Sequence, residues 1–156
     1  MLLLILLPVS ASADPVAPVF DPIRFFEGRT RGTGALKIIL RTKQPITVDG
    51  IGRIEADGSL VLSQQVTQGS APPRTREWRI RETSTGHYTG TLTDAAGPVT
   101  GDSMGRVLTL RYPAKGVAIE QILTLADDGR SARNVLTARK MGIAIARLDE
   151  TIVKEN

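Results

Sequence analysis

Apolar and polar residues alternate along most of this chain, in short segments separated by turn residues about every eight to twelve positions. In segment 33–41, for example, Leu36, Ile38 and Leu40 share one face, while basic residues share the other. This period of two is typical of a β-strand with one face on a core and the other in water. Glycine and proline mark the turns, where the backbone needs a positive φ or cannot extend a ladder.

The same alternation predicts about ten strands in all. They cover residues 33–41, 44–55, 59–67, 75–82, 87–93, 97–103, 106–112, 117–126, 131–140 and 143–153. The connections are too short for the crossover that parallel strands need, so neighbouring strands are antiparallel. Because closure removes the edges of such a sheet, we expect an all-β, antiparallel up-and-down barrel of about 8–10 strands. A two-sheet sandwich is the alternative. An outer-membrane barrel is disfavoured, since three Phe, two Tyr and one Trp cannot form its aromatic girdles.

The N-terminus predicts export. Residues 2–7 form an unbroken apolar run, and residues 11–13 have the small-residue form that signal peptidase cleaves. We therefore interpret 1–13 as a signal peptide, 14–24 as a proline-rich, irregular lead-in and 25–156 as a single barrel domain. The chain has no cysteine, so it has no residue for lipid attachment after the apolar run. The expected location is the bacterial periplasm or the outside, not as a lipoprotein and without a transmembrane segment after signal cleavage.

Charge and composition narrow the expected partners. The net charge of +4 favours anionic partners, although an excess of this size often serves solubility alone. Nucleic acid is not expected, because the chain carries an export signal and lacks clustered aromatic residues for base stacking. With no cysteine and a single histidine, His87, the chain lacks the usual ligands of a transition metal. We expect no metal and no cofactor.

One motif resembles a catalytic site but is better explained by a turn. Residues 101–105, Gly-Asp-Ser-Met-Gly, match G-x-S-x-G, the nucleophile elbow. That elbow is followed by a helix, and by an acid and then a histidine later in the chain. Here 106–112 has the pattern of a strand, and His87 precedes Ser103. We interpret the motif as a hairpin turn and predict no catalytic residue.

Several short motifs, taken in order, resemble one bacterial family. They are Phe25 to Gly32 (FFEGRTRG), Asp57-Gly58-x-Leu60-x-Leu62, Trp78-Arg79-Ile80, Tyr88-x-Gly90-Thr91, Gly97, Gly101, Leu108-x-Leu110-Arg111-Tyr112 and Asn134 through Gly142. The family is domain of unknown function 3833, whose members are small envelope proteins, often lipoproteins, with a lipocalin-like (calycin) barrel. The resemblance covers residues 24–150. It implies the fold, an envelope location and lipid-related work, with no established activity. Segment 144–150 departs from the family, because Arg147 and Asp149 stand where the resemblance implies a glutamate-centred strand.

The inward face of the predicted barrel is the candidate ligand site. A small barrel is either filled by side chains or holds one apolar ligand, and small interior residues such as Gly50 and Ala138 favour a cavity. The candidate lining residues are Leu36, Ile38, Leu62, Trp78, Ile80, Leu108, Leu110 and Leu123. Because a guanidinium group binds carboxylates and phosphates bidentately, Arg29, Arg79 and Arg111 are candidates for an anionic headgroup site. The alternative for these arginines is a solvated outer face.

Three functions follow, in order of preference. The first is a non-enzymatic binder or carrier of a lipid or other amphiphilic ligand in the cell envelope. The second is a solidly packed structural or interaction module that binds an envelope protein. The third is an enzyme acting on lipid, which would need two convergent carboxylates, with Glu120 and Glu150 as candidates.

Overall fold

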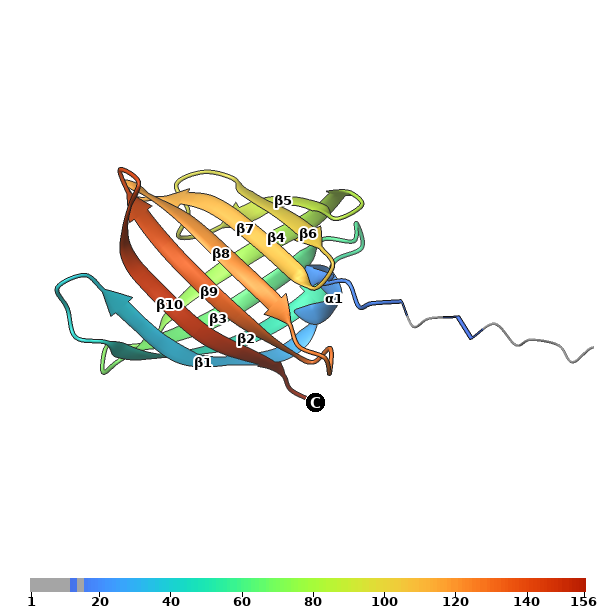
Figure 1. The fold of residues 1–156 in the computed structure, drawn as a ribbon, viewed down its shortest axis with the longest axis horizontal. Helices are drawn as coiled ribbons and strands as arrows, with labels where there is room; N and C mark the ends of the chain where they lie inside the picture. Colours follow the sequence, from blue (N-terminus) through green and yellow to red (C-terminus); the bar gives the residue numbers. More distant parts are fainter. Residues whose placement is uncertain (1–11, 14–15) are drawn as a thin grey trace, which may run out of the picture.

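Ten antiparallel strands form a closed barrel in the computed structural model, which describes residues 12–13 and 16–156 (Figure 1). The strands are β1 (Gly28–Ile38), β2 (Gln44–Ile54), β3 (Leu60–Gln68), β4 (Arg74–Ser84), β5 (His87–Leu92), β6 (Val99–Met104), β7 (Val107–Ala114), β8 (Val117–Leu125), β9 (Ser131–Lys140) and β10 (Ile143–Lys154). A short helix, α1 (Pro22–Phe25), precedes β1. The predicted all-β antiparallel barrel is confirmed, and the sandwich alternative is wrong.

Each strand pairs with its neighbours along the chain, and a single seam closes the barrel. That seam joins β1 to β10, the first and last strands. Gly34 of β1 lies opposite Glu150 of β10. A side chain at Gly34 would place its Cβ 2.1 Å from the carbonyl oxygen of Asp149. Only glycine therefore lets the two strands approach this closely.

One end of the barrel, which we call the floor, is closed by the N-terminal segment. Phe20, Phe25 and Phe26 are buried there and stack edge to face, with ring centroids 5.0 and 4.9 Å apart along the series. The backbone of Phe20 is fixed on both sides, because its N–H donates to the carbonyl of Gly105 and its carbonyl accepts from Ser103 Oγ. The three rings thus plug the barrel at this end.

The lead-in predicted for residues 14–24 is only partly irregular. Asp21 caps α1, since its carboxylate accepts hydrogen bonds from two backbone N–H groups of the first turn. At the other end of the helix, Lys154 Nζ donates to three backbone carbonyls at 2.7 to 3.0 Å. The N-terminal plug is therefore tied to the last strand, and the barrel domain extends back to Phe20.

The opposite end of the barrel, which we call the mouth, carries the turns after β1, β3, β7 and β9 and the loop 93–98 after β5. Figure 1 shows α1 and the C-terminus at the floor, and the long turn between β1 and β2 at the mouth. In the loop, the N–H of Ala96 donates to the carbonyl of Pro113, and Asp94 pairs with Arg74 at 3.1 Å. Loop 93–98 is therefore held against one side of the mouth.

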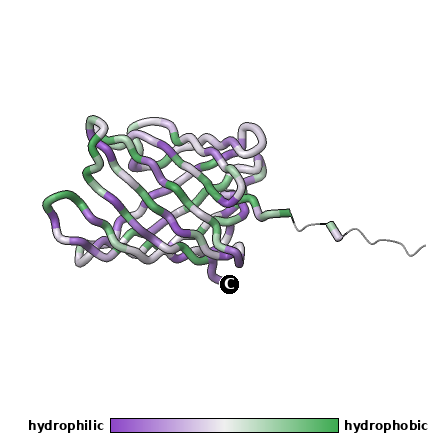
Figure 2. Tube along the Cα trace, viewed as in Figure 1, coloured by the Kyte–Doolittle hydropathy of each residue, from purple (hydrophilic) through white to green (hydrophobic). Residues whose placement is uncertain are grey.

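Apolar side chains fill the interior in two clusters. The larger cluster packs against the floor and contains the three phenylalanines with residues such as Leu60, Trp78 and Leu108. The smaller cluster consists of Ile46, Val48, Val66 and Leu148, with Leu36 and Leu136 packed against it, and comes from the mouth ends of its strands. Figure 2 shows the alternation of hydrophobic and hydrophilic residues along the strands that produces this interior.

Two expectations at the level of the chain need comment. Leu40, expected on the same strand face as Leu36 and Ile38, lies instead in the turn after β1, where its side chain is 97% exposed. The predicted signal peptide falls on residues of which the structure describes only 12–13, and it stays a prediction. Among the described residues, no helix has the length and apolar character of a membrane span.

Candidate functional site

A belt of polar side chains interrupts the apolar interior, and we call it the polar belt. It consists of Gln64 (β3), Arg76 (β4), Tyr112 (β7), Gln121 (β8), Asn134 (β9) and Glu150 (β10). The residues two positions away from each belt residue along its strand face inward. Because side chains alternate between the two faces of a strand, the polar side chain faces inward as well. Five of the six are buried, and Arg76 is partly buried.

Arg76 is fixed in place by two other interior side chains. Its Nε donates to Gln64 Oε1 at 2.7 Å, and Trp78 Nε1 donates to the same oxygen at 2.8 Å. The guanidinium carbon also lies 5.6 Å from the centroid of the Trp78 ring, within the range of a cation–π contact. Among the described residues, no carboxylate forms an ion pair with Arg76. The positive charge of Arg76 inside the barrel therefore has no carboxylate in direct contact with it.

The remaining belt residues form a second hydrogen-bonded chain. Gln121 Nε2 donates to the Tyr112 hydroxyl at 2.9 Å, and Asn134 Nδ2 donates to Gln121 Oε1 at 3.2 Å and to Glu150 Oε2 at 2.9 Å. Asn134 Oδ1 is buried and has no hydrogen-bond partner among the described residues. Buried polar atoms are rarely left in this state, so this oxygen is a vacant acceptor inside the barrel.

Two cavities adjoin the polar belt inside the barrel. The inner one is small, about 40 Å³, and is bounded by belt residues and by apolar side chains of the floor cluster. The outer one, about 700 Å³, lies at the mouth, where Leu92, Tyr112, Ile119 and Leu136 form part of its wall. Arg76 lines both cavities. The floor half of the barrel is therefore packed, whereas the mouth half has room for a small molecule.

Burial disfavours the charged forms of the belt residues. It raises the pKa of Glu150, against the opposing effects of the hydrogen bond from Asn134 and the charge of Arg76. Burial likewise raises the pKa of Tyr112 and lowers the pKa of Arg76. Glu150 therefore accepts a proton more readily inside the barrel than it would in water.

We expect Glu150 to make the folded barrel less stable as the pH rises. Because the pKa of Glu150 is higher in the folded than in the unfolded chain, the folded state binds more protons between the two pKa values. The stabilisation that results is complete below the pKa of Glu150 in the unfolded chain. It is lost as the pH rises through the pKa of Glu150 in the folded chain. Glu150→Gln keeps an oxygen acceptor for Asn134 and removes the charge, so it should raise the midpoint of thermal unfolding by several degrees at neutral pH.

The measurement is thermal unfolding of both proteins across a range of about pH 4 to 8, in which other carboxylates contribute equally to the two curves. Glu120→Gln is the matched control, because Glu120 lies on the outer face of β8, where it pairs with Arg111 at 3.1 Å. Parallel curves for the wild type and Glu150→Gln would show that the buried carboxyl does not titrate as expected.

The eight predicted lining residues all lie on inward positions, but not around the larger cavity. Six of them are buried in the floor cluster: Leu62, Trp78, Ile80, Leu108, Leu110 and Leu123. Leu36 packs on the mouth cluster, and Ile38 lies beyond it at the end of β1. The wall of the mouth cavity comes instead from residues such as Ile119 and Leu136. A role of the eight residues in ligand binding stays a prediction.

The three predicted headgroup arginines do not come together. Arg29, Arg79 and Arg111 are exposed, and each lies on the outer face of a different strand. Arg29 borders a polar groove on the outside of β1 to β4, and Arg111 pairs with Glu120. The structure therefore forms no guanidinium cluster from these three, and their predicted role stays untested.

The catalytic alternatives find no support in the geometry of the described residues. Gly101 to Met104 form the end of β6, and only Gly105 of the motif lies in the turn of the β6–β7 hairpin, so the motif leads into a strand and not into a helix. Ser103 Oγ donates to the carbonyl of Phe20. His87 pairs with Asp102 at 2.6 Å, but on the exposed face of the sheet. Glu120 faces outward and Glu150 inward, so these two carboxylates do not converge. No three His, Asp or Glu side chains among the described residues are placed to hold a metal ion.

The polar belt is the feature that the sequence interpretation missed, although the signal was present. Arg76 is two residues from Trp78 and four from Ile80 along β4, so the alternation that predicts an inward position for both predicts one for Arg76 as well. Glu150 likewise shares its parity with the buried Leu148 and Ile152 of β10. The strand implied by the resemblance to be centred on a glutamate does therefore carry a buried one.

The comparisons with known proteins agree with this fold. Over residues 9–154 the sequence matches the model of a family described as protein of unknown function (DUF3833). Among curated proteins, none matches the chain.

Two solved structures share the barrel. The S-type phycobiliprotein lyase CPES from Guillardia theta has a TM-score of 0.69 and 9% identity, over 86% of this chain and 90% of its own. A protein of unknown function from the DUF3598 family of Nostoc punctiforme has a TM-score of 0.67 and 15% identity, over 92% of this chain. This chain spans 53% of the length of that second protein. At such identities the likeness concerns the fold alone.

Proposed function

The chain belongs to the DUF3833 family, and from its interior we propose that the barrel binds a small amphiphilic molecule, such as a lipid, through the mouth and without catalysing a reaction. The apolar part of the ligand lies in the mouth cavity, and its anionic end meets Arg76. The predicted export segment, 1–13, supports a location in the cell envelope, outside the cytoplasm. In this role the protein is a carrier or a sensor of its ligand.

The observation that carries this proposal is the position of Arg76 at the base of the mouth cavity. The cavity, about 700 Å³, has the size of known small-molecule sites. Its wall includes Leu92, Val117, Ile119 and Leu136, which suit a hydrocarbon chain. The lining also includes Lys115 and the ion pair of Arg74 with Asp94. With Arg76 at its base, such a site would orient an amphiphile with its anionic end inward.

The surroundings of Arg76 favour an anionic ligand group over a neutral one. Gln64 and Trp78 hold the side chain, but they supply no negative charge. A carboxylate or phosphate entering from the mouth could form charge-assisted, bidentate hydrogen bonds with the guanidinium group. These bonds are strongest where water is partly excluded, as it is beside the buried Tyr112 and Trp78.

Binding of a dansyl-labelled fatty acid tests the proposal. Trp78 is the only tryptophan of the chain and lies on the inner cavity, so energy transfer from Trp78 to the dansyl group reports binding of the probe to the barrel, and the variants below locate the site. Arg76→Gln should weaken binding by about tenfold or more, because it removes a charge-assisted contact. Arg76→Lys retains the charge but not the planar guanidinium group, so its affinity for the probe should lie between those of the wild type and Arg76→Gln.

Arg79→Gln is the matched control, since Arg79 lies on the same strand but on the exposed outer face. We expect it to bind the probe as the wild type does. An equal loss for Arg79→Gln and Arg76→Gln would place the anionic contact on the outside of the barrel and overturn the proposed site. No energy transfer with the wild type would overturn ligand binding itself and leave the packed interaction module as the better explanation.

A further inference from the structure

Two turns at the mouth present large apolar side chains to the solvent. Leu40, in the turn between β1 and β2, is 97% exposed, and Met141, in the turn between β9 and β10, is 92% exposed. Ile39 and Ile143 beside them are also exposed. The two turns belong to neighbouring strands, because β1 pairs with β10 and the N–H of Ile39 donates to the carbonyl of Ile145. They project from the same end of the barrel at separate corners (Figure 1). We call these turns the mouth tips.

The backbone at both tips is one that bulky residues avoid. Leu40 has φ 60° and Met141 has φ 49°, and they are the only non-glycine residues of the described chain with a positive φ. Glycine or asparagine adopts this left-handed conformation at less cost. Nothing in the packing of the barrel needs these exposed side chains. Strain kept at an exposed position points to a role outside the folded interior.

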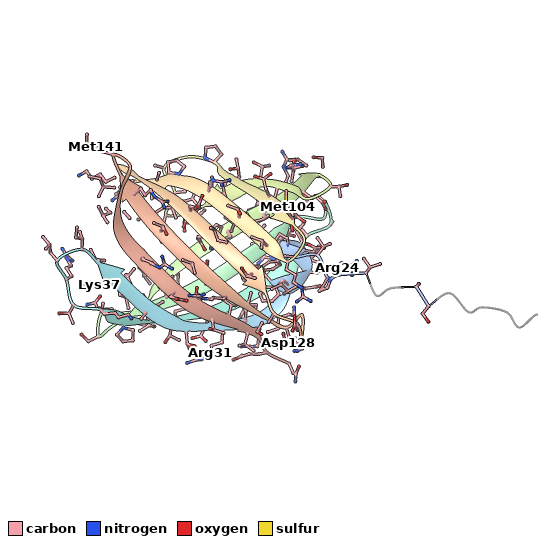
Figure 3. All side chains as sticks on the ribbon, viewed as in Figure 1. Arg24, Arg31, Lys37, Met104, Asp128 and Met141 are labelled. Atoms are coloured by element: carbon pink, nitrogen blue, oxygen red, sulfur yellow. The ribbon has the colours of Figure 1, made fainter. Side chains whose placement is uncertain are left out.

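The charges around the mouth tips are all of one sign. Segments 37–43 and 139–147 contain no Asp or Glu. Their basic residues are Lys37, Arg41, Lys43, Arg139, Lys140 and Arg147. At the floor, by contrast, the turns after β2 and β8 carry acidic residues, including Asp57 and Asp128. Figure 3 shows Lys37 and Met141 at one end of the barrel and Arg24, Met104 and Asp128 at the other.

We propose that the mouth tips dock the barrel on an anionic lipid bilayer, with Leu40 and Met141 inserted between the headgroups and the surrounding Lys and Arg side chains on the phosphates. Exposed apolar residues ringed by basic ones are the combination that binds such interfaces, because the two contributions add. In this orientation the mouth faces the bilayer and the floor faces away. The docking surface is separate from Arg76, so it does not depend on the ligand proposed above.

Flotation with vesicles tests the docking. The vesicles contain phosphatidylcholine alone or in an equal mixture with phosphatidylglycerol. The wild type should float with the mixed vesicles, bind the neutral ones weakly and dissociate as the salt concentration rises. For the double variant Leu40→Asn with Met141→Asn, the partition coefficient onto the mixed vesicles should fall by about tenfold or more, because two apolar side chains are lost from the interface.

Asparagine is chosen because it tolerates a positive φ. The double variant should therefore unfold at the same temperature as the wild type or at a higher one, which separates lost docking from lost folding. Met104→Asn is the matched control, since Met104 ends β6 at the floor, where its side chain is 85% exposed. It should float as the wild type does. Equal flotation of the double variant and the wild type, or an equal loss for Met104→Asn, would overturn the proposal.

A second measurement shows which end of the barrel touches the lipid. The chain has no cysteine, so Met141→Cys and Met104→Cys each accept one environment-sensitive fluorophore. On mixed vesicles the emission should shift to the blue for the label at 141 and stay unchanged for the label at 104. A blue shift of the emission for the label at 104 alone would place the floor on the bilayer and contradict the proposed orientation. Arg76→Gln should still float, and the tip variant should still bind the dansyl fatty acid, so the two proposals fail separately.

Discussion

Replacing Phe20 by alanine should lower the free energy of unfolding by about 3–5 kcal/mol, as is usual for the truncation of a fully buried phenylalanine. Phe20 has no exposed surface and packs edge to face on Phe25. Its backbone is held by Gly105 and Ser103, so the segment cannot simply collapse into the space left by the ring. The loss would open the barrel at its floor, where the larger apolar cluster is packed.

Denaturant unfolding followed by Trp78 fluorescence measures this effect. Val19→Ala is the matched control, because Val19 precedes Phe20 and its side chain is 60% exposed. It should change the free energy of unfolding by less than about 0.5 kcal/mol, as surface substitutions usually do. If both variants lost little stability, the N-terminal segment would not be part of the cooperative barrel.

Gly34→Ala should destabilise the barrel by about 3 kcal/mol, the upper part of the usual range for overpacking. The added Cβ would lie 2.1 Å from the carbonyl oxygen of Asp149, a backbone atom that cannot rotate away. The strands β1 and β10 would have to separate at the seam that closes the barrel. We therefore expect a lower thermal midpoint together with greater exposure of the interior to a hydrophobic dye.

Gly101→Ala provides the comparison for the seam variant. Its added Cβ would approach the end of the Leu110 side chain at 2.9 Å, and a methyl group of a leucine can move aside. We expect it to destabilise the barrel clearly less than Gly34→Ala does. The two variants are compared in the same thermal unfolding experiment. An equal loss of stability for both would mean that the close contact at the seam does not account for the effect of Gly34→Ala.

The strands and their antiparallel order could be predicted because the local pattern determines them. Each turn joins two strands that pair with one another, so the chain order and the order around the barrel coincide. Alternation then assigns the inner face strand by strand, as for Trp78 and Ile80. A meander is thus the topology in which local patterns carry most of the information about the fold.

What could not be predicted depends on contacts between distant segments. Phe20 follows a proline-rich stretch without alternation, and its burial results from a contact with Gly105 across the floor. Leu40 continues the alternation of its strand, yet β1 ends before it. The parity of Arg76 was visible, whereas its contact with Gln64 and its place between two cavities required the register of β3 against β4.

The single seam between β1 and β10 also sets the order in which the barrel assembles. Nine pairings are hairpins of neighbouring strands, each closing only a short loop of chain. The tenth pairing joins the first strand to the last, so its formation carries most of the entropic cost of loop closure and comes late in folding. Until that step, β1 and β10 are unpaired sheet edges of the kind that accept a strand from another molecule. Exchange of an edge strand between two copies is therefore the characteristic way in which this chain would misassemble.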